Sequence, residues 1–591
     1  MEFKPLYLTD KIIFDEFLKA NSKVFGVSEG SELNFANLYA WKDDDKLEIY
    51  ISVNFLVIKG VNRGKIYFLP PLAKSFDDFI KAINFIRKYT NSIEHLLFIY
   101  STPIEIINKI KPYLLKDNFL VFPNRDLAEY IYEAEGFITL SGKKMHAKRN
   151  FVNRFRALYD YEARKYTKSD FDELINNLKK WDEKRYDDDE INAITSVLNN
   201  LEQLDAECFI IKVDRKIVAF TIWARSAVNK DLVYTLFEKG NLEYEGVFQA
   251  INNFNAQANF SEFKFINRQE DMGIPNLRKA KLSYPVHHLD MKYTIIDKLL
   301  FDELKDLYKM TFNETDKYTS FLFDHLNYHQ FEYLENKKEI VSSLFEVEKQ
   351  ISYFKQIIPS ILIVGVLTKE TYRNQGKCNI LFDKTLNNLA KQGIPFVYLY
   401  PVDHEFYKRY GFNLINYLDS PKDLGEEILG SIKEIYEKET ANHLIYQVRT
   451  DEDYDFLNCK IKALDGNVSI HENGYVISSS DSIEEVISYS SKKELGMMGR
   501  ILDIKHMLMY YPFDHFDNNF NIKITDELIE KNNCTLKLSF NERLIIEETC
   551  DIPDLTLDIK ELTSLIFLGS EETNGFKSLF IKQNPLIVDK Y

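Results

Sequence analysis

The feature that most constrains the fold is an apolar run that leads through a glycine-containing turn into a helical pattern. Residues 361–368 read Ile-Leu-Ile-Val-Gly-Val-Leu-Thr, a run of apolar and β-branched residues that predicts a buried strand. The turn 372–378, Tyr-Arg-Asn-Gln-Gly-Lys-Cys, then opens onto residues 379–391, which have helical spacing. Such a turn points several backbone N–H groups and the positive end of the helix dipole at one place. We therefore expect a pyrophosphate to bind at this turn.

A tyrosine-rich motif follows the next predicted strand, residues 396–400. Residues 407–412 read Tyr-Lys-Arg-Tyr-Gly-Phe. This order of strand, glycine turn, helix, strand and tyrosine motif resembles the GNAT acetyltransferases, and more narrowly those of the Eis type. The segment 498–504 and the residues after it resemble the sterol-carrier-protein-like C-terminal domain of that family. The resemblance covers residues 297–591.

The resemblance implies that acetyl-CoA is the cofactor and that no metal is needed. In the family the strand bonds the pantetheine arm through its backbone, and the turn holds the pyrophosphate through its N–H groups. Carried over residue by residue, these positions are Val364, Val366 and Thr368 on the strand and Arg373, Asn374, Gln375, Gly376, Lys377 and Cys378 at the turn. Cys378 stands where the family motif has a small residue, so an ordinary strand-to-helix turn remains an alternative.

The same resemblance implies two catalytic groups. Tyr407 would protonate the departing thiolate, which is the role of a general acid. The C-terminal carboxylate, here that of Tyr591, would accept the proton of the amine. Because an α-carboxyl has an unperturbed pKa of about 3.5, burial would have to raise that pKa or water would have to relay the proton. The alternatives are an ordinary core tyrosine at position 407 and a frayed chain end at position 591.

The charge distribution bears on the acceptor. Residues 1–296 carry equal numbers of acidic and basic residues, so the whole net charge of −16 lies in the second half of the chain. An acidic half attracts cationic small molecules. Asp403, His404 and Glu405, on the loop after the strand 396–400, are candidates to help bind a cationic amine, although His404 is equally well explained as a surface histidine.

Residues 1–296 carry a different set of motifs. The longest is 267–285, in which a glycine ends a polar loop just before a helix start. Together with residues 34–41 and 141–150, it closely resembles an uncharacterised bacterial family similar to the catalytic domain of phosphatidylglycerol lysyltransferases. This resemblance implies two GNAT-like lobes in tandem, with an aminoacyl-tRNA or an acyl-CoA as the donor. This chain has no flippase-like membrane segment, which weakens a role in lipid modification.

Candidate site residues of this half fall into two groups. The segment 267–285 contains Arg268, Glu270, Asp271, Arg278 and Lys281, which form either a functional site or an internal salt-bridge network. The basic stretch 141–157 contributes Lys144 and Arg149, which are candidates to contact the phosphates of tRNA or lipid. A solvated helix face is the alternative explanation of that stretch.

Length and cysteine usage narrow the class of protein. A chain of 591 residues predicts several domains. No apolar run approaches the roughly 18 residues of a membrane span, and the start lacks the pattern of a signal peptide, so we expect a cytoplasmic location. The five scattered cysteines have no CxxC spacing and indicate neither a disulfide framework nor a zinc site. A homo-oligomer remains open.

The predicted fold class is α/β with mixed sheets, made of tandem GNAT-like folds and a C-terminal sterol-carrier-protein-like α+β domain. The predicted domains are a phosphatidylglycerol-lysyltransferase-like region at 1–296, a GNAT domain at 297–420, a second GNAT-like or connecting region at 421–494 and a sterol-carrier-like domain at 495–591. The predicted function is transfer of acetyl from acetyl-CoA to a primary amine of a cationic small molecule or a lysine. The alternatives are an aminoacyl-tRNA-dependent transferase acting through the first half, and a non-catalytic ligand-binding protein on degenerate folds.

Overall fold

The computed structural model divides the chain into two compact units. The units are Met1–Leu300 and Phe301–Tyr591, and each is described by itself. The structure describes residues 2–62, 65–181, 188–326, 331–419, 426–472, 474–479, 482–488, 493–513, 519–541, 543–572 and 576–588. The finer predicted domain bounds stay a prediction.

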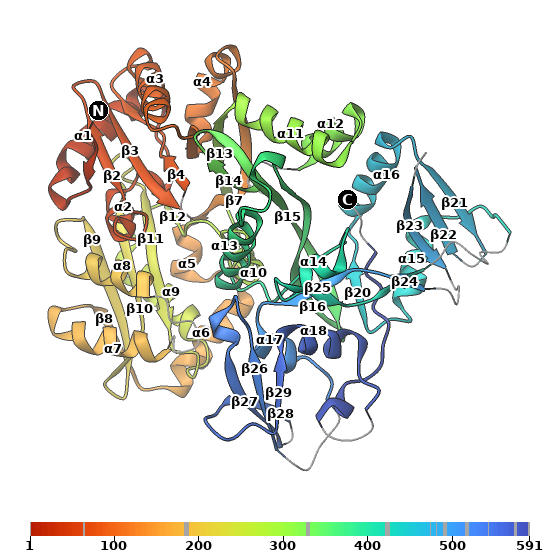
Figure 1. The fold of residues 1–591 in the computed structure, drawn as a ribbon. Coiled ribbons are helices and arrows are strands. Elements are labelled where there is room, and N and C mark those ends of the chain that lie inside the picture. Colours follow the sequence, from red (N-terminus) through yellow and green to blue (C-terminus); the bar gives the residue numbers. More distant parts are fainter. Residues whose placement is uncertain are drawn as a thin grey trace. The chain divides into compact units, whose positions relative to one another are not determined.

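The strands described in the first unit form one thirteen-stranded sheet (Figure 1). Its order is β1-β2-β3-β4-β6-β13-β7-β12-β11-β10-β9-β8, with β5 paired to β3. The strands are β1 (Lys4–Pro5), β2 (Glu48–Ile51), β3 (Phe55–Asn62), β4 (Lys65–Phe68), β5 (Leu72–Ala73), β6 (Phe98–Pro103), β7 (Phe119–Glu133), β8 (Tyr161–Lys165), β9 (Ala206–Val213), β10 (Lys216–Arg225), β11 (Leu232–Gly240), β12 (Phe265–Asn267) and β13 (His288–Asp297).

Two long strands, β7 and β13, join two lobes in the middle of this sheet. β13 pairs antiparallel with β7 and, on its other side, antiparallel with β6. In the first lobe β4 lies parallel to β6, with Phe68 opposite Ile99. In the second lobe β11 lies parallel to β12, with Leu232 opposite Phe265. Each lobe therefore has one parallel junction in an otherwise antiparallel sheet, as expected for tandem lobes of similar architecture.

The helices of the first unit cover this sheet with amphipathic faces. They are α1 (Lys11–Phe25), α2 (Phe35–Trp41), α3 (Phe76–Ser92), α4 (Ile104–Lys116), α5 (Ala134–Thr139), α6 (His146–Leu158), α7 (Phe171–Trp181), α8 (Asp188–Leu198), α9 (Val247–Asn259) and α10 (Pro275–Leu282). In α7 the residues Leu174 and Leu178 are buried four positions apart, which is the spacing of one face of a helix.

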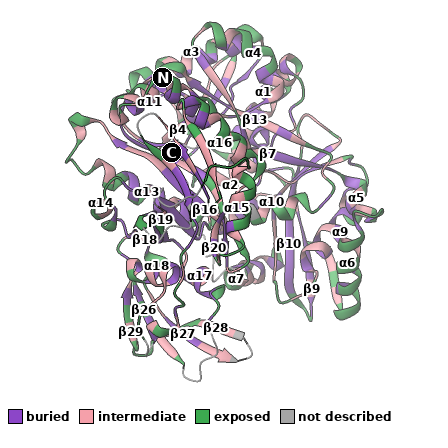
Figure 2. Ribbon diagram, turned by 90° about the vertical axis from the view of Figure 1, so that its right-hand side faces the viewer, coloured by how far each residue is buried: buried purple, intermediate pink, exposed green. Residues whose placement is uncertain are grey.

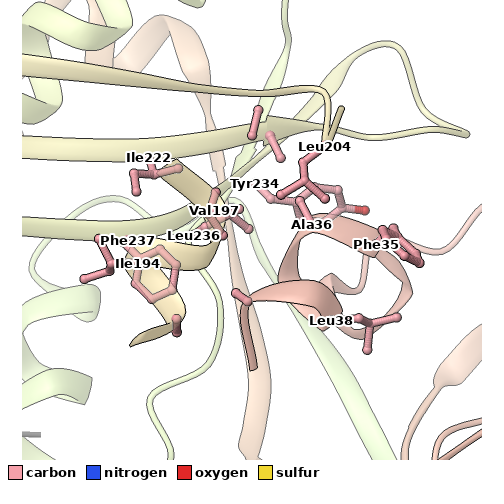
Figure 3. Packing of buried hydrophobic residues seen from close by; sticks show 14 of the residues in the cluster. Phe35, Ala36, Leu38, Ile194, Val197, Leu204, Ile222, Tyr234, Leu236 and Phe237 are labelled. Atoms are coloured by element: carbon pink, nitrogen blue, oxygen red, sulfur yellow. The ribbon is translucent and has the colours of Figure 1, made fainter. Parts of the chain in front are cut away.

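One core cluster of the first unit shows how helices and sheet pack (Figure 3). Side chains of α2, α8 and the strands β10 and β11 meet there. The labelled members are Phe35, Ala36, Leu38, Ile194, Val197, Leu204, Ile222, Tyr234, Leu236 and Phe237. β9 and β10 form an antiparallel hairpin, and both strands contribute to this core.

The strands described in the second unit build a seven-stranded sheet in the order β14-β15-β16-β17-β25-β18, with β20 paired to β15. They are β14 (Phe331–Asn336), β15 (Glu339–Tyr353), β16 (Gln356–Thr368), β17 (Phe396–Leu399), β18 (Asn413–Leu414), β20 (Ile445–Val448) and β25 (Met498–Ile501). The predicted strand 361–368 is confirmed, and it starts earlier because Phe354 and Lys355, with φ of 48° and 68°, form a tight turn that extends the hairpin with β15. β25 lies between β17 and β18.

The remaining elements of the second unit surround this sheet. The helices are α11 (Lys298–Phe312), α12 (Asp316–His325), α13 (Lys377–Lys391), α14 (His404–Lys408), α15 (Ile432–Thr440), α16 (Asp451–Ala463), α17 (Ile504–Met509) and α18 (Ile559–Leu568). Small sheets are formed by β19 (Tyr417–Asp419) with β24 (Lys493–Leu495), and by β21 (Asn467–His471), β22 (Gly474–Ser478) and β23 (Ile483–Ser488). A four-stranded sheet has the order β28 (Arg543–Glu548), β27 (Cys534–Asn541), β26 (Phe520–Thr525) and β29 (Leu555–Asp558).

Burial follows the predicted periodicity in both units. Figure 2 shows buried residues along the strands and exposed residues on the outer sides of helices. In α13 the residues Leu381, Phe382, Leu386 and Leu389 are buried, and they form the core under the sheet together with β16 and β17. The mixed α/β class is thus confirmed. None of the described helices is long and apolar enough to cross a bilayer.

Candidate functional site

The strands β16 and β17 separate at their C-terminal ends. They pair in parallel from Ser360 opposite Phe396 to Leu362 opposite Tyr398, and this pairing ends there. β16 continues beside β15, where the ladder shifts register next to Gly365. This glycine has φ +60°, and a Cβ would lie 2.7 Å from the Phe345 ring, so a side chain does not fit. The separated stretch contains Val364, Val366 and Thr368, which are half-buried.

A turn with left-handed backbone follows this stretch. Asn374 has φ +61°, and Gly376, the N-cap of α13, has φ +71°. No side chain caps the N-terminus of α13, and a Cβ placed on Gly376 would find no atom within 4 Å. Arg373, Asn374, Gln375 and Gly376 are exposed. The first backbone N–H groups of a helix therefore face open space, and this arrangement suits an anionic group.

Side-chain contacts fix the conformation of the turn at residues 372–378. The Tyr372 hydroxyl donates to Glu339 Oε2 at 2.8 Å, and Lys369 forms an ion pair with the same carboxylate. Arg373 Nε donates to the Thr368 carbonyl at 3.2 Å, and Gln375 Nε2 to the Thr371 carbonyl at 2.9 Å. Lys377 is half-buried at the start of α13. These contacts hold the backbone of the predicted cofactor residues, so the residues fit a pyrophosphate through their main chain.

Cys378 is half-buried behind the turn rather than exposed in it. Burial raises the pKa of its thiol, and the Tyr410 hydroxyl, which is in hydrogen-bond contact with it, opposes this shift. The thiol therefore stays protonated near neutral pH and acts as a small packing group.

Tyr407 lies in α14, close to the start of α13. The Asp403 side chain caps α14 by accepting from the N–H groups of Glu405 and Phe406 at 2.9 and 3.4 Å. Tyr407 is 8% exposed, and burial, with smaller contributions from the titratable groups Cys378 and Asp403, raises its pKa to about 12. The phenol thus remains neutral and able to donate a hydrogen bond over the physiological range. The structure brings Tyr407 and Cys378 together, as the motif order predicts for one site.

The predicted base Tyr591 lies outside the described residues, which end at Val588. The segment before it is well anchored. Leu586 N–H donates to the Ile445 carbonyl of β20 at 3.0 Å, and Asn416 Nδ2 donates to the Ile587 carbonyl at 2.7 Å. This segment lines a cavity of about 210 Å³. The described part of the cavity wall consists of Asn416, Tyr417, Leu418, Asp419, Glu439, His443, Ile487, Lys493, Asn584, Pro585, Leu586 and Val588.

The cavity wall contains the carboxylates Asp419 and Glu439. Glu439 is 8% exposed, and its Oε1 has no hydrogen-bond partner among the described residues. Asp419 forms an ion pair with Lys493. His404 Nε2 lies 3.2 Å from the Gly496 carbonyl, and Gly496 N–H donates to the Asn416 carbonyl at 3.2 Å. Two contacts therefore link the helix of Tyr407 to the cavity wall. Asp403 and Glu405 are exposed.

The first unit has helix N-termini at the same place in its two lobes, but both are covered. In the first lobe Ser75 caps α3, and its side chain accepts from the Asp78 N–H at 3.1 Å. In the second lobe the N-cap of α9 is Gly246, with φ +80°. A Cβ on Gly246 would lie 2.6 Å from the Phe151 carbonyl oxygen of α6. The Tyr159 hydroxyl also accepts from the Glu245 N–H at 3.1 Å.

A buried charge cluster around Lys292 lies in the middle of the first unit. Lys292 is fully buried, and its Nζ lies 2.5 Å from Asp290, 3.2 Å from Glu32 and 3.7 Å from Glu129. Burial opposes the charge on Lys292, but the three carboxylates outweigh burial and raise its pKa. Burial also raises the pKa of Glu32 to about 8, while Lys292 opposes this shift. The sequence analysis missed this cluster, because its four members come from three segments distant in sequence.

Three of the predicted residues of 267–285, Arg268, Asp271 and Arg278, form ion pairs outside this cluster. Asp271 is buried and accepts from Arg278 Nε at 2.9 Å and from the Tyr130 hydroxyl at 2.5 Å. Arg278 also reaches Asp126 at 2.5 Å. Arg268 Nη2 pairs with Glu238 at 2.8 Å. For these residues the structure shows the salt-bridge network that was the alternative.

Lys281 and Glu270 have pKa values shifted from their ordinary values. Lys281 Nζ donates to the backbone carbonyls of Arg268 and, at 3.1 Å, of Gln269. Burial lowers the pKa of Lys281 to about 8. Burial and the Glu129 charge raise the pKa of Glu270, and Lys281 opposes this shift. A lysine and a carboxyl whose pKa values move toward each other are typical of functional sites as well as of buried networks.

The basic stretch behaves mainly as a solvated face. Lys144 is exposed, before the start of α6. Arg149 Nη1 donates to the Leu140 carbonyl at 2.5 Å and thereby closes the N-terminal loop of α6. Lys144 is free to contact a polyanion, whereas Arg149 has a structural contact. Among the described residues no group of three His, Cys, Asp or Glu side chains is placed to hold a metal ion.

Three family models match consecutive parts of the chain. Residues 26–296 match "Phosphatidylglycerol lysyltransferase, C-terminal", residues 293–415 match "Acetyltransferase (GNAT) domain" and residues 504–574 match "Sterol carrier protein domain". No curated protein sequence matches the chain.

Solved structures align with about half of the chain each. A conserved protein of unknown function from Bacteroides thetaiotaomicron is 28% identical over 50% of this chain and 100% of its own, with a TM-score of 0.46. A probable N-acyltransferase from Enterococcus faecalis is 17% identical over 50% and 98%, with a TM-score of 0.41. Eis1 from Mycobacterium abscessus is 12% identical over 49% and 97%, with a TM-score of 0.39.

The family models confirm the resemblances inferred from the motifs. The first half of the chain is similar to the C-terminal region of phosphatidylglycerol lysyltransferases, and the second half joins a GNAT acetyltransferase domain to a sterol carrier protein domain.

Proposed function

We propose that the second unit transfers an acetyl group from acetyl-CoA to a primary amine of a cationic small molecule or of a lysine. One observation carries this proposal: the left-handed turn at Gly376 presents the uncapped N-terminus of α13 to open space, beside a stretch of β16 that β17 leaves unpaired. Among the three GNAT-like turns described above, this is the one without a cap or cover. A thioester cofactor would supply an activated acyl group at this place.

The chain's own residues divide the remaining work. The backbone of Val364, Val366 and Thr368 is placed to bond an extended arm, because the pairing between β16 and β17 ends before it. The N–H groups from Asn374 to Cys378 would hold the two phosphates together with the helix dipole. No side chain has to move for either contact, since both use the main chain. The Arg373 N–H already donates to the Glu370 carbonyl at 3.1 Å, so Arg373 would contribute through its side chain.

Tyr407 supplies a proton as the acyl group is transferred. The amine nitrogen forms a bond to the acyl carbon, the carbon–sulfur bond breaks, and the leaving sulfur takes the phenolic proton of Tyr407. The amine loses its proton to a base, for which we propose the terminal carboxylate of Tyr591, directly or through water. The raised pKa of Tyr407 keeps its proton in place until the sulfur develops negative charge.

The cavity beside the chain end is the proposed acceptor site. Its Glu439 carboxylate has one oxygen without a hydrogen-bond partner in the described part of the chain, which favours an incoming ammonium group. The acidic composition of the second half acts in the same direction at longer range. Asp403 and Glu405, exposed at the start of α14, are further contacts for a cation.

Thermal shift with coenzyme A and acetyl-CoA tests the cofactor site. A ligand that binds the native state raises the unfolding temperature. At a ligand concentration of a hundred times Kd, the free energy of unfolding rises by about 2.7 kcal/mol. Gly376→Asp places a carboxylate where the pyrophosphate would bind and should abolish the shift. Gly393→Asp is the matched control, because Gly393 has φ +77° and equally open surroundings. If both variants keep the shift, or both lose it, the proposed pyrophosphate site is wrong.

A second candidate function belongs to the first unit. Its match to phosphatidylglycerol lysyltransferases and the shifted pair Glu270 and Lys281 favour transfer of an aminoacyl group from a tRNA. Co-purification of tRNA, and binding that weakens steeply as salt rises, would support it. Lys144→Glu should weaken that binding, whereas an absence of tRNA affinity at low salt would exclude it.

A further inference from the structure

A buried arginine, Arg500, joins the tyrosine turn to the sterol-carrier-like region. Its side chain is 1% exposed. Nη1 donates to the carbonyl oxygen of Tyr410 at 2.6 Å, and Nη2 pairs with Asp526 Oδ1 at 2.6 Å. Tyr410 ends the turn that begins at Tyr407, whereas Asp526 directly follows β26 of the four-stranded sheet. The Arg500 guanidinium therefore contacts both the tyrosine turn and the sterol-carrier-like region.

The fit around this guanidinium is close. Gly411 has φ +81°, and a Cβ at this position would overlap Arg500 and lie 3.1 Å from Ile559 of α18. Asn413 Nδ2 donates to the Lys560 carbonyl of α18 at 3.0 Å. The turn is thus held by the sterol-carrier-like region at two places, through Arg500 and through α18. Only glycine at position 411 allows this approach.

Asp526 is itself fixed, so it holds Arg500 in a single geometry. Its Oδ1 accepts from the N–H groups of Leu528 and Ile529 at 3.0 and 3.1 Å. Its Oδ2 accepts from Asn532 Nδ2 at 2.9 Å. A carboxylate with this many donors is rigid, and charge-assisted hydrogen bonds of this kind are among the strongest in proteins.

Tyr410 passes this constraint on to the cofactor turn. Its hydroxyl donates to Asn379 Oδ1 in the first turn of α13 at 2.7 Å. Its ring stacks on Phe382 of α13 with the centroids 4.3 Å apart. Its N–H donates to the Tyr407 carbonyl at 3.0 Å. Arg500, Tyr410 and the start of α13 therefore form one connected unit around Tyr407.

We propose that Arg500 is a positioning residue for the transfer reaction. It fixes the carbonyl of Tyr410 and so sets the place of Tyr407 relative to the pyrophosphate turn, while Asp526 sets Arg500. This inference rests on the proposed acetyl transfer by the second unit. The sterol-carrier-like region is then a structural part of the acyltransferase site, because it supplies the group that holds the proton donor in place.

The test replaces the ion pair by apolar side chains. The double variant Arg500→Met with Asp526→Leu removes both charges, so that no buried charge is left unpaired. The matched control is Arg449→Met with Glu485→Leu, a pair with side chains 3% and 4% exposed that lies between β20 and β23. Asp526→Asn is a third variant, which keeps the shape of the side chain but leaves the buried Arg500 charge without its carboxylate. Folding of each is checked by thermal denaturation.

Kinetics give the first readout. For the Arg500/Asp526 variant we expect kcat for acetyl transfer to fall about tenfold to a hundredfold, as for a small misplacement of a reacting group. KM for acetyl-CoA should stay nearly constant, because the main-chain contacts at Gly376 are kept. The pH dependence of kcat should shift on its alkaline side. The control pair should leave kcat and its pH dependence unchanged.

A readout without substrate separates this inference from the proposed function. Fluorotyrosine incorporation, with Tyr407→Phe to assign the signal, reports the surroundings of Tyr407 by ¹⁹F NMR. The titratable groups facing it are the neutral thiol of Cys378 and the carboxylate of Asp403. Its signal should move in the Arg500/Asp526 variant, less in Asp526→Asn and not in the control. An unmoved signal in a folded variant overturns the inference, whereas a moved signal in a protein without acetyl transfer overturns the proposed function alone.

Discussion

Two glycines in the two units have nearly the same backbone and opposite surroundings. Gly376 and Gly246 are both N-caps, of α13 and α9, with φ of 71° and 80° and ψ of 6° and 7°. No side chain caps either helix. Around Gly376 the space is open to 4 Å, whereas Gly246 faces the carbonyl of Phe151 in α6. The turn at Gly376 is a candidate binding site, whereas the turn at Gly246 packs against α6.

The comparison teaches that a favourable helix N-terminus becomes a site only if nothing in the same unit occupies it. In the first unit α6 and Ser75 cover the two turns, and charges gather instead in the buried cluster of Lys292. In the second unit the charged residues at the turn, such as Arg373 and the Lys369–Glu339 ion pair, leave the main chain exposed. The two units therefore place their polar groups by different rules, although their sheets share one parallel junction per lobe.

The largest expected effect concerns the proton donor beside the open turn. Tyr407→Phe should lower kcat for acetyl transfer about a hundredfold or more, because general acid catalysis contributes at least this much. Steady-state kinetics with a panel of polyamines and aminoglycosides would measure it. Tyr510→Phe, at a partly exposed tyrosine of the same unit, should leave kcat unchanged. Full activity of the Tyr407 variant would remove this residue from the mechanism.

An intermediate effect tests the comparison of the two glycines directly. Gly246→Ala should lower the free energy of unfolding by about 3 kcal/mol, because left-handed strain adds to overlap with the Phe151 carbonyl. Gly376→Ala should lower it by about 1 kcal/mol, since only the strain applies. Chemical denaturation would measure both losses of stability. Hydrogen exchange would assign each loss to α9 or to α13. Equal losses would mean that the two turns are equally covered.

The smallest effect concerns the buried charges of the first unit. Lys281 has a folded pKa of about 8, below that of an unfolded lysine. Between about pH 8 and 10.4 the unfolded chain binds a proton that the native state lacks, so stability rises with pH, by about 1 kcal/mol per unit. Lys281→Met should remove this rise in denaturant titrations. The exposed Lys230→Met should keep it, and parallel curves for wild type and Lys281→Met would contradict the shifted pKa.

The sequence was most informative where the signal is local. The run 361–368, the left-handed glycine at 376 and the helical spacing of 379–391 each depend on neighbours in the chain, so strand, turn and helix could be predicted. Tyr407 could be placed near the turn because the motif order fixes it.

Contacts between distant segments could not be predicted. Lys292, Glu32, Glu129 and Asp290 meet only when β7 and β13 pair, and no local pattern marks the meeting. Arg500 looks like an ordinary charged residue in an apolar strand until the turn at Tyr410 lies against it. For Asp271 and Arg278 the residue types suit either a site or a network, and only the structure shows that the two side chains pair with each other.

The shared strands β7 and β13 have a consequence for anyone who would take the first unit apart. Because β13 and β7 lie between the strands of the two lobes, neither lobe alone has a complete sheet edge at this place. Cutting the unit between them would leave a raw strand edge that invites association with other chains. We therefore expect the two lobes to fold and unfold together.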